Sequence, residues 1–175
     1  CIGCNTTTKQ KETETETTKK PNVIVILIDD AGYADFGFMG SKDLETPNID
    51  ALATNGIVLT DAHVSATVCA PSRAGIITGK YQQRFGFEAN GTGGIGLSDD
   101  VVTIADVFKS NGYRTYALGK WHLGFDSSDH PNQRGFDEFY GHLHTEVGFY
   151  PPFANLGGKD FQRNGKSIDD DGYET

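Results

Sequence analysis

Apolar residues in this chain form short runs that are separated by polar, glycine-rich segments. The longest run, residues 23–28, is continuous and rich in β-branched residues. This pattern predicts a central parallel strand that is buried on both faces. Residues 57–59 and 113–118 are shorter runs of the same kind and predict two further strands. A polar hairpin is expected within residues 162–175, because Asn164-Gly165 is a strong turn signal.

Two segments combine a helix signal with a following strand. Thr46 and Thr103 are suitable N-caps, and each precedes an amphipathic stretch that an Asn-Gly pair ends. A third, shorter helix is predicted to start at Pro71, just after Cys69, and to end at Gly79. The repeated order of helix, Asn-Gly and strand predicts α/β layering with a largely parallel sheet.

Composition narrows the class of protein. The chain has 175 residues, of which 37% are hydrophobic and 22% charged, as is typical of a globular domain. Its net charge of −9 argues against a nucleic-acid partner. A site for an anionic substrate on this protein would therefore need positively charged side chains gathered around it. No apolar run is long enough to span a membrane.

The N-terminal segment, residues 1–20, is predicted to be a flexible polar tether that precedes a domain over residues 21–175. Cys1 and Cys4 form a C-x-x-C, but neither a second Cys pair nor a His pair completes a zinc site. A mature bacterial lipoprotein begins at a lipidated cysteine, which favours a lipid anchor at Cys1 and a location in the periplasm or at the cell surface. The alternative is an arbitrary fragment boundary.

Polar side chains that could bind a metal or transfer a proton follow the predicted strands. Asp29 and Asp30 end the first strand, and two adjacent carboxylates suit a divalent cation such as Ca²⁺ or Mg²⁺, although each is also a normal turn or cap residue. Lys120 and His122 follow a later strand as candidate cationic or proton-transferring groups. A solvated lysine and a capped loop histidine are the alternatives for this pair.

Cys69 lies at the start of a predicted helix, with Arg73 one turn further on. Free backbone N–H groups and the positive end of the helix dipole at this point favour an anion such as sulfate or phosphate. The alternative is a small buried cysteine. Cysteine-dependent phosphatase loops place more residues between Cys and Arg than the three found here, so a thiolate nucleophile would lack its usual phosphate cradle.

Together, a metal, an anion-binding helix start and two cationic side chains indicate sulfuryl or phosphoryl transfer.

Two other motifs are weaker evidence for a functional site. The G-x-G-x-x-G of residues 91–96 does not link a strand directly to a helix, so a mobile loop is favoured over a nucleotide site. His142 and His144 form an H-x-H, for which a structural or substrate-rim role is favoured over a metal.

Several segments, taken in order, resemble the type I sulfatases. Residues 69–73 match the signature C-x-P-S-R, and residues 29–37 resemble the family's first metal motif, D-D-x-G-x-x-D-x-G. Residues 119–124, GKWHLG, resemble the second signature, and residues 135–141 are also similar to the family. The resemblance covers about residues 21–175. It implies an alkaline-phosphatase-like α/β/α sandwich with a largely parallel mixed sheet, truncated at its C-terminal side because family members are considerably longer.

The resemblance also implies a mechanism. A separate formylglycine-generating enzyme would convert Cys69 to formylglycine, whose hydrate has two hydroxyls: one attacks sulfur and the other expels sulfate. Asp29 and Asp30, with the modified Cys69, would bind Ca²⁺, with Mg²⁺ as the alternative. The remaining ligands and the leaving-group acid are expected outside these 175 residues, so the isolated segment is expected to be inactive.

Three further roles follow from the same resemblance. Arg73 would orient the formylglycine, Lys120 would contact it and the sulfate, and His122 would contact its hydroxyl. The expected activity is sulfate ester hydrolysis, with a sulfated carbohydrate as the substrate because of the predicted surface tether. The alternatives are a phosphodiester or phosphonate monoester hydrolase of the same superfamily, and a non-catalytic lipoprotein that binds sulfated glycan.

Overall fold

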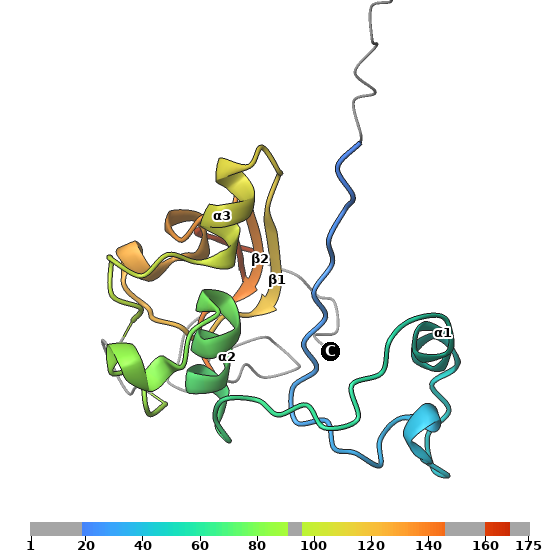
Figure 1. The fold of residues 1–175 in the computed structure, drawn as a ribbon. Coiled ribbons are helices and arrows are strands. Elements are labelled where there is room, and N and C mark those ends of the chain that lie inside the picture. The colour runs from blue at the N-terminus through green and yellow to red at the C-terminus, as the bar shows by residue number, and fades with distance from the viewer. Residues whose placement is uncertain (1–18, 91–95, 146–159, 169–175) are drawn as a thin grey trace, which may run out of the picture. The chain divides into compact units, whose positions relative to one another are not determined.

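The computed structural model describes residues 19–90, 96–145 and 160–168 (Figure 1). The chain divides into two compact units, residues 1–46 and 47–175. Residues 1–18 of the predicted tether and residues 91–95 of the glycine-rich motif lie outside the described residues. No helix in the described ranges combines the length and apolar character needed to cross a bilayer.

The first unit corrects the prediction for residues 23–28. These residues are not in a strand, and their side chains are 43 to 83% exposed, from Leu27 to Ile24. A strand is held by hydrogen bonds to a neighbouring strand, and no strand of the described sheet pairs with this run. The apolar sequence alone therefore does not form the element. Past a turn that contains Asp29 and Asp30, the unit includes the 3₁₀ helix η1, Gly37–Met39.

Among the described residues, the second unit contains the α-helices α1, Pro47–Asn55; α2, Cys69–Thr78; and α3, Ile104–Ser110. Pro47 begins α1 as predicted. Thr103 caps α3 in a capping box: its hydroxyl accepts from the Asp106 N–H at 3.1 Å, and the Asp106 carboxylate accepts from the Thr103 N–H at 2.9 Å. Gly79 ends α2 in the left-handed region, with a φ of 64°.

The sheet of the second unit has four strands in the order β1-β2-β3-β4. Strand β1, Tyr116–Lys120, pairs in parallel with β2, Glu138–His142. Strands β3, Gln162–Arg163, and β4, Lys166–Ser167, extend the sheet as an antiparallel hairpin. The sheet is therefore mixed, and the connection from β1 to β2 runs through the 3₁₀ helices η3, Ser127–Asp129, and η4, Pro131–Gln133.

Three strand predictions have different outcomes here. Residues 57–59 are not in a strand and are exposed, so that prediction is wrong for the same reason as for residues 23–28: nothing in the described sheet pairs with them. The strand predicted at 113–118 exists but lies later, at 116–120. The hairpin turn at Asn164-Gly165 is confirmed, because both residues have positive φ, 50° and 78°.

A small core packs one side of the sheet against helices α2 and α3. Phe139 of β2 is 1% exposed, and Ala74 of α2 is fully buried. The buried core residues are Ala70, Ala74, Phe87, Leu97, Ala105, Trp121, Leu123, Phe136, Phe139 and Leu143. This core fixes α2 beside the carboxyl ends of β1 and β2 (Figure 1).

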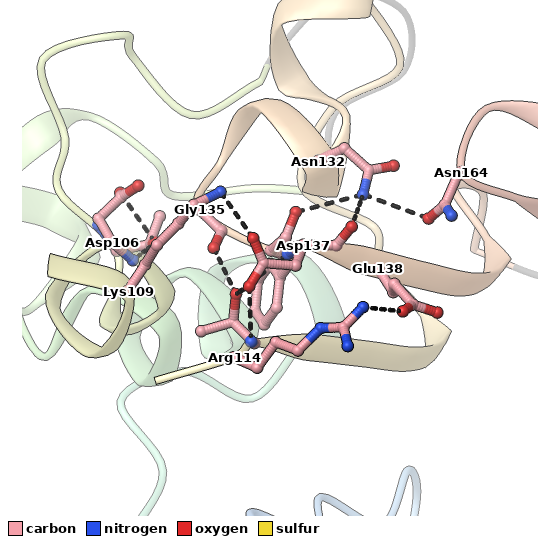
Figure 2. Close-up of polar contacts among 11 residues, drawn as sticks. Asp106, Lys109, Arg114, Asn132, Gly135, Asp137, Glu138 and Asn164 are labelled. Carbon is pink, nitrogen blue, oxygen red and sulfur yellow. Dashed lines mark hydrogen bonds and ion pairs between the residues drawn. The ribbon is translucent and has the colours of Figure 1, made fainter. Parts of the chain in front are cut away.

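The Gly-Phe-Asp motif at residues 135–137 has a structural role (Figure 2). The Asp137 carboxylate accepts a hydrogen bond from the Thr115 N–H at 3.0 Å. It also pairs with Lys109 of α3 at 2.9 Å. The Thr115 hydroxyl donates in turn to the Gly135 carbonyl at 2.7 Å. These contacts tie the beginnings of β1 and β2 to α3, and so set where both strands end.

We expect Asp137→Asn to lower the melting temperature at neutral pH. Hydrogen bonds from Lys109 and the Thr115 backbone hold the pKa of Asp137 below its usual range. A depressed carboxylate pKa stabilises the fold above the unfolded-state pKa of about 3.9, and the contribution is lost as pH falls through the folded-state pKa. Thermal unfolding from pH 7 downward should therefore show a difference between wild type and variant that shrinks below about pH 4.

The matched control for this prediction is Glu138→Gln. Glu138 is the next residue and pairs with Arg114 at 3.0 Å, but these side chains are more exposed, Arg114 at 69% and Glu138 at 41%. Exposed ion pairs contribute little to stability. If Glu138→Gln lowers the melting temperature as much as Asp137→Asn does, the contacts of Asp137 contribute no more to stability than an exposed ion pair.

Candidate active site

Helix α2 presents Cys69 at its first position. The cysteine is a half-buried free thiol. Ala70, Pro71 and Ala74 are buried behind it, because small residues on this face let the helix pack closely on the core. The helix begins at Cys69 rather than at Pro71, two residues earlier than predicted. Residue 69 is therefore held by regular helix geometry, with Arg73 one turn further along the same helix.

The start of α2 has fewer free N–H groups than the sequence suggested. Pro71 has none, and the Ser72 N–H donates to the Val68 carbonyl at 3.2 Å. The Ala70 N–H donates to the Asn90 side-chain oxygen at 3.0 Å. Of these groups, the Ala70 N–H is therefore already paired with a side chain, while the anion site expected at this helix start stays a prediction. Nearby side chains add positive charge to it.

Arg73 joins α2 to the end of β1. Its Nη1 donates to the carbonyl oxygen of Lys120 at 2.6 Å. A charged guanidinium on a carbonyl is a strong, directional contact. The bond places the arginine beside the last residue of β1, so two of the predicted cationic residues belong to one small region. A region with two cations is notable in a chain whose net charge is −9.

The backbone of β1 and β2 is specialised at this end. Gly119 pairs with Gly141, and a side chain on Gly141 would collide with the Gly119 carbonyl, so glycine is required for this close approach. Two residues after Lys120 the ladder continues, since the His122 N–H donates to the Leu143 carbonyl at 3.0 Å.

His122 is held in an unusual conformation. It is 2% exposed and has a φ of 56°, in the left-handed region. That conformation costs a non-glycine residue on the order of 1 kcal/mol or more and is enriched at functional sites. The buried, strained position differs from that of an ordinary surface loop residue, and the choice between a capped loop histidine and a functional one stays a prediction.

His142 and His144 each have hydrogen-bond partners within the chain. His142 ends β2 opposite Lys120, and its Nδ1 lies 2.9 Å from the His144 carbonyl, which fixes the proton on Nδ1. His144 lies beyond the strand. Its backbone N–H and its Nδ1 both contact the Asp160 carboxylate at 2.7 Å. This arrangement favours the structural or rim role that was predicted over metal binding.

The charge state of His142 follows from its surroundings. Burial lowers the pKa of His142, and the charges of Lys120 and Arg73 lower it further, while Asp160 and the His144 carbonyl act in the opposite direction. The imidazole is therefore held neutral at neutral pH, beside the two cations. His142 lies at the same strand end as Lys120 because of the parallel register of β1 and β2, which the spacing of the two residues along the chain does not predict.

Asp29 and Asp30 belong to the first unit, where both are exposed and Asp30 has a φ of 56°. Their carboxylate oxygens are the donor type that Ca²⁺ and Mg²⁺ prefer, so the chemistry of the pair fits the implied metal. Among the described residues, no group of three or more His, Cys, Asp or Glu is arranged to hold an ion. Ca²⁺ takes about six to eight oxygen ligands, which is more than these two carboxylates supply.

Comparison with known proteins decides the family. The family model described as Sulfatase matches residues 21–161, most of the chain. The chain belongs to the sulfatase family. Mouse (Mus musculus) arylsulfatase G is 40% identical over 126 residues, which are 70% of this chain and 24% of that protein. Human (Homo sapiens) steryl-sulfatase is 39% identical over 144 residues, 74% of this chain and 25% of that protein. The chain thus spans about a quarter of the length of these curated relatives.

Solved sulfatase structures share the fold. The crystal structure of Ps i-CgsB matches with a TM-score of 0.79 and 40% identity, over 89% of this chain and 38% of that one. BT4656, solved with its substrate D-glucosamine-2-N,6-O-disulfate, matches with a TM-score of 0.73 and 30% identity, over 89% of this chain and 28% of that one. The predicted α/β, alkaline-phosphatase-like fold is confirmed, with this sulfatase chain covering only part of it.

Proposed function

We propose that the complete protein is a sulfuric ester hydrolase that releases sulfate from a sulfated carbohydrate. The observation that carries this proposal is the bond from Arg73 to the Lys120 carbonyl, because it unites the C-x-P-S-R helix with the strand end that bears Lys120 and His122. This contact supports the proposal that the two signatures that identify the family contribute to one site.

We assign one role to each candidate residue of the second unit. Arg73, fixed on α2 one turn from residue 69, orients that residue. Lys120 supplies positive charge to the sulfate, which stabilises the charge that develops on its oxygens. His122 contacts the hydroxyl of the modified residue 69. As formylglycine, residue 69 would supply one hydroxyl that attacks sulfur and a second that allows sulfate to leave.

Asp29 and Asp30 would hold the divalent cation, Ca²⁺ or Mg²⁺, which would supply Lewis-acid stabilisation of the sulfate oxygens. A formylglycine-generating enzyme that reads residues 69–73 is the partner that this chemistry requires. The carbohydrate substrate is supported by two relatives: Ps i-CgsB, also solved in complex with k-i-k-neocarrahexaose, and BT4656 with its disulfated glucosamine.

The test uses the protein at its full natural length, purified from its native host. Sulfated oligosaccharides and phosphate esters of matched alcohols are incubated with it, and free sulfate and phosphate are quantified. We expect sulfate release that is faster than phosphate release and that is absent in Cys69→Ala. Hydrolysis of phosphate or phosphonate esters that is faster than sulfate release would show that the protein is a phosphoesterase of the same superfamily instead. Tight binding of sulfated glycan without turnover would indicate a binding protein.

A further inference from the structure

The hydrogen bond at the start of α2 assigns a role to a residue that none of the motifs contains. The N-cap residue, Val68, is apolar and makes no side-chain capping bond. In most helices a Ser, Thr, Asp or Asn at this position accepts from the N–H of the second or third helical residue. Here Ala70 is the second residue and Pro71, the third, has no N–H. The Ala70 amide is therefore the one in the first turn that a cap can satisfy.

Asn90 satisfies that amide from twenty residues further along the chain. Its side-chain oxygen accepts from the Ala70 N–H at 3.0 Å. The segment that bears Asn90 is anchored nearby. Phe87 is 3% exposed and belongs to the same buried cluster as Ala70 and Ala74, and Gln82 is 1% exposed and donates to the Ser65 carbonyl at 3.0 Å. The asparagine thus reaches α2 from a segment that the core holds in place.

The bond acts on residue 69 through the geometry of the peptide unit. The carbonyl of Cys69 and the N–H of Ala70 lie in one planar group. A partner that fixes the direction of this N–H also fixes the plane, and with it one of the two soft backbone torsions of Cys69. Together with Arg73, which holds the same helix to the Lys120 carbonyl, the bond restricts where the residue 69 side chain points.

We propose that Asn90 is a positioning residue for the reacting group at residue 69, acting through the Ala70 amide. This inference rests on the proposed sulfatase function for its kinetic consequences. Small displacements of a nucleophile are costly, since a misplacement of about 1 Å can reduce a rate about 10²-fold. The position of the reacting oxygen would then depend on a residue outside the C-x-P-S-R signature.

The test compares Asn90→Leu, which keeps the size but removes the acceptor, with Asn90→Asp, which keeps the acceptor and adds charge. Both are made in the full-length protein, and rates are expressed per mole of formylglycine, measured by peptide mass. We expect Asn90→Leu to lower kcat about 10- to 100-fold. Asn90→Asp should keep kcat close to wild type and raise KM, because the added carboxylate repels an anionic substrate.

The matched control is Asn55→Leu. Asn55 ends α1, is exposed, and donates within its own helix, to the Ala51 carbonyl at 2.7 Å. We expect its kcat and KM to match wild type. A purely structural cap predicts a lower melting temperature in Asn90→Leu with unchanged kcat per mole of formylglycine, and that result would overturn the proposal.

A second readout separates this inference from the proposed function. In protein made without the generating enzyme, the rate at which iodoacetamide alkylates Cys69 reports the placement of the thiol without any turnover. We expect this rate to change several-fold in Asn90→Leu and not in Asn55→Leu. If the wild-type enzyme releases no sulfate, the proposed function fails and the alkylation rates decide the role of Asn90. Equal rates in wild type and Asn90→Leu would overturn it.

Discussion

Replacing Cys69 with Ser should stop the reaction after one turnover. Serine has one hydroxyl, which can bond to sulfur as the ester oxygen leaves with a proton as the alcohol. The product is a sulfate ester on residue 69. Its release would require a second hydroxyl on the same carbon, which expels sulfate as a carbonyl forms, and serine has none. The steady-state rate should fall on the order of 10³-fold or more.

The measurement is a stopped time course of alcohol release followed by the mass of the peptide of residues 43–73. Wild type should release many equivalents of alcohol and keep an unsulfated peptide. The Cys69→Ser variant should release about one equivalent and gain one sulfuryl group on that peptide, and Cys69→Ala should do neither. Steady turnover by the serine variant at the wild-type rate would rule out a mechanism that needs two hydroxyls.

Replacing Arg73 with Lys should lower kcat about 10²-fold while leaving most of the fold intact. The guanidinium of Arg73 donates to the Lys120 carbonyl at 2.6 Å, and under the proposed function the same side chain also orients residue 69. A lysine ammonium is a point charge on a shorter side chain and does not reproduce the planar fork of N–H donors that these two roles would use. The loss should therefore fall on the chemical step more than on substrate binding.

The control for this variant is Arg84→Lys. Arg84 is an exposed residue of the 3₁₀ helix η2, Gln82–Phe85, and carries the same change of side chain. Formylglycine content is measured for both variants, since residues 69–73 are also the segment that the generating enzyme reads. An Arg73→Lys enzyme with wild-type kcat per mole of formylglycine would show that the contact with Lys120 has no catalytic role.

The helices of this chain were largely predictable because their signals are local. Thr103 and Asp106 form the capping box by themselves, and Gly79 ends α2 in the conformation that glycine adopts most easily. The start of α2 was misplaced because Pro71 is tolerated anywhere in the first turn. Such errors move a boundary by one or two residues but leave the order of elements unchanged.

The strands were less predictable because each needs a partner. Residues 23–28 and 57–59 have the composition of buried strands, yet the described sheet pairs with neither. A run of β-branched residues favours the extended conformation, but a strand forms in a sheet only where another segment of the chain supplies its hydrogen bonds. The segment at 113–118 did form a strand, displaced toward its C-terminus, where β2 offers a parallel neighbour.

The candidate site was predictable to the extent that its residues share motifs. Arg73 and Lys120 were both named from the sequence, and one hydrogen bond unites them. The places of His142 and Asn90 were not foreseen, because they depend on strand register and on a contact between segments twenty residues apart. Spacing along a sequence carries no information about either.

The proposed mechanism depends on residue 69 being formylglycine. The mass of the peptide of residues 43–73, from the full-length protein of the native host, tests this requirement. We expect a peptide in which the thiol of residue 69 has been replaced by an aldehyde, in a preparation that releases sulfate. An unmodified thiol, from a host that converts the cysteine of its other sulfatases, would contradict it and favour a protein that binds sulfated glycan without turnover.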